Sequence, residues 1–120
     1  MLLDSNIIIY STQPGFEYLH DFFQKNQPKV SAISKVEVLG FHALTADDRR
    51  DLEMFFQTLE ILPVSDSVVD QAVLLRQQQR MKLGDALIAA TAVTYKLPLA
   101  TRNVSDFANI AQLQVVNPIK

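Results

Sequence analysis

The chain contains no cysteine, only two histidines and only three glycines. Without cysteine it has neither a disulfide framework nor thiolate ligands for zinc, and two isolated histidines are too few for a histidine-rich transition-metal site. Any metal ion would therefore be bound by oxygen atoms, which Mg²⁺ and Mn²⁺ prefer. The scarcity of glycine and the absence of repeats and linkers indicate short connections within one compact unit.

The sequence also lacks a hydrophobic run long enough to cross a membrane, and no positively charged segment precedes an apolar one. We therefore expect a cytoplasmic protein that does not contact a membrane. An excess of positive charge is missing too, since 11 Lys and Arg residues face 13 Asp and Glu residues. This counts mildly against a nucleic-acid partner, but cations bound among clustered carboxylates would reverse the local potential where a phosphate approaches.

The apolar segments are short and alternate with stretches of helical spacing. With 120 residues, 48% of them apolar, the chain can form one core, so we expect a single domain over residues 1–120. Strands are predicted at residues 1–4, 28–33, 60–64, 97–101 and 113–116. Helices are predicted at residues 6–11, 16–23, 34–44, 45–59, 67–81 and 84–96. This order predicts an α/β fold, a three-layer sandwich whose mostly parallel central sheet of about five strands is flanked by helices.

Four acids stand near the ends of predicted strands or the starts of predicted helices: Asp4, Glu37, Asp85 and Asp106. Each has a simpler explanation as a helix cap, and Ser34 with Glu37 matches the capping box. Serine, threonine or asparagine would cap equally well, however, so capping does not require acids at several junctions. Because open α/β sheets bind ligands at the carboxyl ends of their strands, the co-occurrence favours one metal-binding crevice.

The segment Thr101, Arg102, Asn103 follows the fourth predicted strand. Its hydroxyl, cation and amide could meet a phosphate or a metal-bound water, or the segment could be an ordinary Asx or ST turn. Both interpretations stay open on these residues alone.

Three cations, Arg76, Arg80 and Lys82, gather near the end of the helix predicted at 67–81. They form either a solvated face or a rim that contacts phosphate. The solvated face is favoured, because cations are expected at the carboxyl end of any helix.

Four segments together carry a resemblance to a known family: LLDSNI at 2–7, SKVE at 34–37, LGDALIAA at 83–90 and ATRNVSDF at 100–107. The chain resembles PIN-domain proteins, and among them the VapC-type toxins of bacterial toxin–antitoxin pairs. The segments occur in the order of the family and span nearly the whole chain.

The resemblance implies a role for each candidate. Asp4, Glu37 and Asp85 would be catalytic acids that bind Mg²⁺ or Mn²⁺, and Asp106 would be a further one. Many members of the family have an aspartate where this chain has Asn103, so the fourth ligand is Asn103, Asp106 or both. The remaining three candidates would support the site: Thr101 by orienting a water or phosphate oxygen, Asn6 by supporting the first acid, and Arg102 by positioning substrate.

The leading hypothesis is a metal-dependent endoribonuclease that acts as the toxin of a type II toxin–antitoxin pair. Metal ions held by these acids would lower the pKa of a bound water, so no catalytic histidine is needed. The implied partners are an RNA substrate, a cognate antitoxin that covers the site and a second copy in a homodimer. The alternative is a PIN-like binding or regulatory domain with weak or no turnover. A phosphorylated-aspartate fold is disfavoured, because Ser5 and Asn6 stand where such folds place a second acid.

Overall fold

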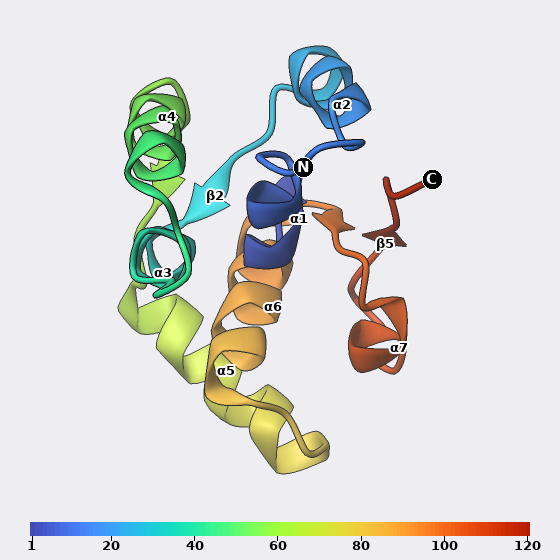
Figure 1. The fold of residues 1–120 in the computed structure, drawn as a ribbon. Helices are drawn as coiled ribbons and strands as arrows, with labels where there is room; N and C mark the ends of the chain where they lie inside the picture. Colours follow the sequence, from blue (N-terminus) through green and yellow to red (C-terminus); the bar gives the residue numbers. More distant parts are fainter.

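Five short parallel strands form the centre of the computed structural model, which describes residues 1–120 (Figure 1). They are β1 (Leu2–Leu3), β2 (Val30–Ser31), β3 (Ile61–Leu62), β4 (Leu99–Ala100) and β5 (Val115–Val116). β4 pairs with β1 and with β5, β2 pairs with β3, and one parallel bridge between Leu2 and Lys29 joins the two groups. The order is therefore β3-β2-β1-β4-β5. The prediction of a parallel sheet of about five strands is confirmed, although the strands are shorter than predicted.

Seven helices connect and flank these strands. They are α1 (Ser5–Tyr10), α2 (Tyr18–Asn26), α3 (Ala32–Leu39), α4 (Ala46–Gln57), α5 (Asp66–Gln78), α6 (Leu83–Tyr95) and α7 (Val104–Phe107). Three of them start at side-chain caps, because the hydroxyls of Ser31, Thr45 and Ser65 accept hydrogen bonds from backbone amides in the first turns of α3, α4 and α5. The sequence did not predict α7, and none of the helices is long and apolar enough to cross a membrane.

Adjacent residues in the central strands point to opposite faces of the sheet. Leu2 and Leu99 pack into a core with residues of α5, α6 and α7, whereas Leu3 and Ala100 pack into a second core with residues of α1 to α4. All four of these strand residues are fully buried. The sheet is therefore the middle of three layers, as predicted. Most apolar residues of α6 lie in or against the first core, whereas Leu83 and Tyr95 are exposed.

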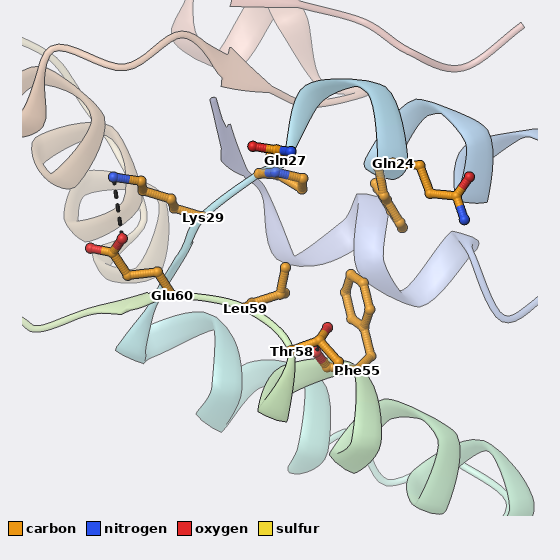
Figure 2. Close-up of a pocket in the computed structure, with 9 residues that line it drawn as sticks. Gln24, Gln27, Lys29, Phe55, Thr58, Leu59 and Glu60 are labelled. Atoms are coloured by element: carbon orange, nitrogen blue, oxygen red, sulfur yellow. Dashed lines mark hydrogen bonds and ion pairs between the residues drawn. The ribbon is translucent and has the colours of Figure 1, made fainter.

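At the amino edge of the sheet, where β2 and β3 begin, there is a hollow of about 510 Å³ (Figure 2). We call it the amino-edge hollow. Lys29 and Glu60 line it and form an ion pair of 3.3 Å between Nζ and Oε1. Phe23 of α2 and Phe55 of α4 also line it, with ring centroids 5.2 Å apart. This edge thus combines aromatic packing with charges that neutralise each other.

Candidate active site at the carboxyl edge of the sheet

Asp4 is the first residue after β1 and is only 4% exposed. Its backbone amide donates to the carbonyl of Ala100 (2.8 Å), which holds it at the carboxyl edge of the sheet. The hydroxyl of Thr101, directly after the neighbouring strand β4, donates to Asp4 Oδ2 (2.7 Å). Asp4 does occupy the cap position of α1, but its side chain makes no capping hydrogen bond. Its carboxylate is therefore positioned by Thr101, not used as a cap.

Glu37 reaches the same region from α3. The capping-box interpretation of Ser34 and Glu37 is wrong, because α3 begins at Ala32 and the hydroxyl of Ser31 accepts the capping hydrogen bond from the amide of Ile33. Ser34 and Glu37 therefore lie within the helix. Ser5 Oγ donates to Glu37 Oε1 (2.7 Å) and lies 3.0 Å from Ser34 Oγ. These contacts attach the Glu37 carboxylate to the start of α1, directly beside Asp4.

Asp85 lies in the first turn of α6, whose cap position is Lys82. Asp85 is therefore not the cap of this helix, and its carboxylate lies where the helix dipole favours negative charge. Gly84, the preceding residue, lies directly against Glu37: a Cβ atom placed on Gly84 would be 2.6 Å from Glu37 Oε2. The lack of a side chain at position 84 is what lets α6 approach α3 at this point.

The segment after β4 brings a fourth acid. The amide of Asn103 donates to the Thr101 hydroxyl (3.0 Å), and the amide of Asp106 donates to the Asn103 carbonyl (3.0 Å), which starts the short helix α7. The ST turn, one of the two interpretations of this segment, is thus present and leads into a helix. Asn103 stands at the cap position of α7 but makes no capping hydrogen bond with its side chain.

The pKa values of two of these four carboxylates respond to burial and to the charges of the neighbouring acids. Burial raises the pKa of Asp4 and that of Asp85 above their ordinary values. The charges of Glu37 and Asp106 raise both pKa values further, and Asp4 also acts on Asp85. The hydroxyl of Thr101 opposes the rise at Asp4, and the cation of Lys82 opposes it at Asp85. The site therefore holds several negative charges close enough to repel one another.

The donor chemistry of this group fits a hard divalent cation, because every candidate ligand atom is a carboxylate or carboxamide oxygen and no cysteine or histidine takes part. No three acidic or histidine side chains come close enough together to form a complete metal-binding cluster.

The two remaining predicted residues are placed differently. Arg102 Nη1 donates to the Tyr10 hydroxyl (2.6 Å), and its guanidinium lies 5.1 Å from the centre of the Tyr10 ring. Arg102 is thus held against the end of α1. Asn6 is exposed and makes no side-chain hydrogen bond to Asp4, so its supporting role stays a prediction. Sequence reasoning missed Ser5 and the spatial role of Gly84, although both are direct neighbours of predicted acids.

The chain is similar to known proteins of one family. A family model described as "PIN domain" matches residues 1–113. The chain is similar to Ribonuclease VapC10 of Mycobacterium tuberculosis, with 29% identity over 123 residues that cover 95% of this chain and 90% of the relative. It is also similar to Ribonuclease VapC of Rickettsia bellii, with 46% identity over 46 residues, which is 36% of this chain and 34% of that protein.

Solved structures agree in fold. The chain matches a toxin–antitoxin complex from Klebsiella pneumoniae with a TM-score of 0.82 and 33% identity, covering 99% of this chain and 98% of the other. It matches VapBC2 from Rickettsia felis, bound to a DNA fragment from its promoter, with a TM-score of 0.80 and 23% identity, covering 97% and 96% of the two chains. At that lower identity the second likeness shows the fold alone.

Proposed function

Because this chain belongs to the PIN-domain family, we propose that it is a metal-dependent endoribonuclease that hydrolyses RNA phosphodiester bonds, and that it is the toxin of a type II toxin–antitoxin pair in the cytoplasm. The observation that carries the proposal is the gathering of four acids from four separate segments at the carboxyl edge of one parallel sheet. The names of the curated relatives, both ribonucleases, support the reaction class.

The proposed metal ligands are Asp4, Glu37, Asp85 and Asp106. Mg²⁺ or Mn²⁺ bound there would lower the pKa of a bound water. Its positive charge would stabilise the phosphodiester as negative charge develops on it. Thr101 keeps the Asp4 carboxylate oriented, and Ser5 does the same for Glu37. With both carboxylates held, little reorganisation is needed when the phosphate arrives. Asp4 itself is only 4% exposed, so bulk water has little access to its carboxylate.

Asp106 is the better candidate for the fourth ligand. Its charge acts on both Asp4 and Asp85, which places it within electrostatic reach of the group. Asn103 contributes its backbone amide to Thr101 and its carbonyl to α7, so its established contacts build the turn. Comparing Asp106→Asn with Asn103→Ala tests this choice: we expect the first to weaken Mn²⁺ binding more than the second.

The direct test is cleavage of RNA by purified protein with added Mg²⁺ or Mn²⁺. Wild type should cut, and Asp4→Asn and Asp85→Asn should lose cleavage, because each replaces a charged ligand with a neutral amide of the same shape. The exposed Asp70→Asn on α5 is the matched control for removal of one negative charge elsewhere. Cleavage that survives in both site variants would sink the assignment.

A second candidate is a PIN-like domain that binds without turnover. The observation in its favour is that the acids do not stand in the close geometry of a complete metal cluster. Calorimetry with Mn²⁺ separates the two candidates when combined with the cleavage assay. Binding together with cleavage supports the nuclease, whereas RNA binding without Mn²⁺ binding and without cleavage supports the second candidate.

We also propose a cognate antitoxin as partner, since a similar chain was solved as a toxin–antitoxin complex. An antitoxin that placed a cation among the acids would relieve their repulsion and block metal binding at once. Co-expression with the adjacent reading frame tests this: a small copurifying protein that suppresses RNA cleavage is expected, and a partner that leaves cleavage unchanged contradicts it.

A homodimer is proposed as well. Val69, Val73 and Leu74 on α5 are 42%, 50% and 49% exposed, so this helix presents apolar side chains outward while its other face packs in the core. Light scattering on wild type and on Val73→Asp checks the assignment. Wild type should have the mass of a dimer and the variant that of a monomer.

A further inference from the structure

A second hollow, of about 420 Å³, adjoins the candidate active site. We call it the carboxyl-edge hollow. Two of the proposed metal ligands, Asp85 and Asp106, line it. The connection between α5 and α6 contributes Arg80 and Lys82, and α7 contributes Ser105, followed by Asn109 just beyond the helix.

The two cations of this hollow have no carboxylate partner. The only ion pairs in the structure are those of Lys29 with Glu60 and of Arg50 with Asp47. Arg80 and Lys82 therefore line the same hollow as two acids without pairing with either of them. Unpaired cations that share a hollow with the proposed catalytic acids are free to bind an anion that enters it.

The placement of these cations also separates the two interpretations of the basic helix end. Arg76 lies on the last turn of α5 and does not line the hollow, which agrees with an ordinary solvated side chain. Arg80 and Lys82 come after the helix, in the segment that starts with the extended residue Gln79 (φ −155°, ψ 160°). That segment carries both cations out of the helix and onto the hollow beside the acids.

A metal ion held by the acids would act on the scissile phosphate, whereas cations beside the acids can attract the phosphates that flank it. We propose that the carboxyl-edge hollow binds the RNA phosphate next to the scissile one, with Arg80 and Lys82 contacting its oxygens and Ser105 and Asn109 supplying uncharged donors. This inference rests on the proposed function and assigns to its substrate a second binding point. Arg80 and Lys82 are thus substrate-positioning residues that do not touch the reacting atoms.

The test uses Arg80→Gln, Lys82→Gln and the double variant, with Arg76→Gln as the control that removes one cation outside the hollow. Binding of a fluorescein-labelled single-stranded RNA is measured by anisotropy in an Asp4→Asn background, which stops cleavage. Each single variant should weaken binding about three- to tenfold. In the double variant, the dependence of log affinity on log salt concentration should become shallower by about 0.7, the amount expected for one phosphate on a single strand.

Steady-state cleavage of the same RNA in the otherwise wild-type protein gives the second measurement. The double variant should have a raised KM, whereas Arg76→Gln should change neither KM nor kcat. Equal RNA affinity and KM in the double variant and the control would overturn the inference while leaving the nuclease proposal intact. If wild type neither cleaves nor binds RNA, the proposed function fails, and the inference fails with it.

Discussion

The two edges of the central sheet both carry charged residues and a hollow. Opposite charges form an ion pair at the amino edge, whereas like charges lie near one another at the carboxyl edge. At the amino edge, Lys29 and Glu60 form an ion pair beside a hollow of about 510 Å³ (Figure 2). At the carboxyl edge, Asp4 and Asp85 are brought near two further acids, and the adjoining hollow is smaller, at about 420 Å³. The size of a hollow is therefore a poor guide to the site in this molecule. Acids that are brought together without an ion-pair partner are the better guide.

The two edges differ because different charged residues stand before the strands and after them. The residues that precede β2 and β3 include one cation and one anion, which neutralise each other where the strands begin. The residues that follow β1 and β4 include the first acid and the hydroxyl that holds it, and α3 and α6 each add an acid. Bringing these acids together costs stability in the absence of a cation. Acids are brought together in this way at the carboxyl edge and not at the amino edge, so only the carboxyl edge has the carboxylate ligands for a cation.

The largest effect on this comparison is expected from Thr101→Val. Valine has the shape of threonine but cannot donate to Asp4, and it leaves the Asn103 amide without its partner. RNA cleavage should fall about 10- to 100-fold, as is typical when a group that orients a metal ligand is lost. Thr101→Ser, which keeps the hydroxyl, should restore most of the activity. Equal kcat/KM for Thr101→Val and wild type would show that the carboxyl edge does not depend on this hydrogen bond.

A second change acts through space alone. In Gly84→Ala, the new Cβ would be 2.6 Å from Glu37 Oε2, so the carboxylate must move away from its place beside Ser5. We expect Mn²⁺ affinity and cleavage to fall several-fold. The melting temperature should stay the same or rise, because alanine favours a helix over glycine by about 1 kcal/mol. A variant that is less stable but fully active would contradict this account of Gly84.

The acids of the carboxyl edge should make the stability of the metal-free protein depend on pH. In metal-free protein, the pKa values of Asp4 and Asp85 are raised on folding, so the folded state binds more protons than the unfolded state. The free energy of unfolding should therefore decrease as pH rises from about the ordinary aspartate pKa through the raised values. Urea titrations at several pH values in EDTA measure this trend, and Asp4→Asn should flatten it. Stability that increases with pH over that interval in wild type, and does so equally in Asp4→Asn, would contradict the prediction.

The smallest effect is expected at the amino edge. Glu60→Gln removes the ion pair with Lys29, whose two side chains are 61% and 40% exposed. An exposed pair of this kind contributes about 0–1 kcal/mol, so the free energy of unfolding should change by no more than that. Cleavage should be unaffected. A large loss of activity in Glu60→Gln would mean that the amino edge takes part in function, and the contrast between the edges would be broken.

Local signals explain which parts of the fold were predictable from the sequence. The starts of α4 and α5 follow from Thr45 and Ser65, because a cap acts within three residues. The start of α3 was misjudged because Ser31 and Ser34 are both plausible caps, and the choice of Ser31 depends on β2 ending there. The helix α7 has only four residues, too few to show a helical pattern.

In the candidate site, too, the features with a local signal could be predicted and the contacts between distant residues could not. The positions of Asp4, Glu37, Asp85 and Asp106 could be recognised because each lies near the end of a predicted strand or the start of a predicted helix, and because the segments around them resemble those of a known family. The hydrogen bond between Ser5 and Glu37 joins residues 32 positions apart, and the contact of Gly84 with Glu37 joins α6 to α3. Such contacts exist only once the helices are packed. No local pattern in the sequence could have predicted them.

We propose that the acids of the carboxyl edge form a site for a hard divalent cation. Isothermal titration of metal-free protein with Mn²⁺ tests it most directly, in wild type, Asp4→Asn, Asp85→Asn and Glu60→Gln. Wild type and Glu60→Gln should bind Mn²⁺ with equal affinity, and the two site variants should bind at least about tenfold more weakly. Absence of binding in wild type, or unchanged binding in both site variants, would contradict the claim.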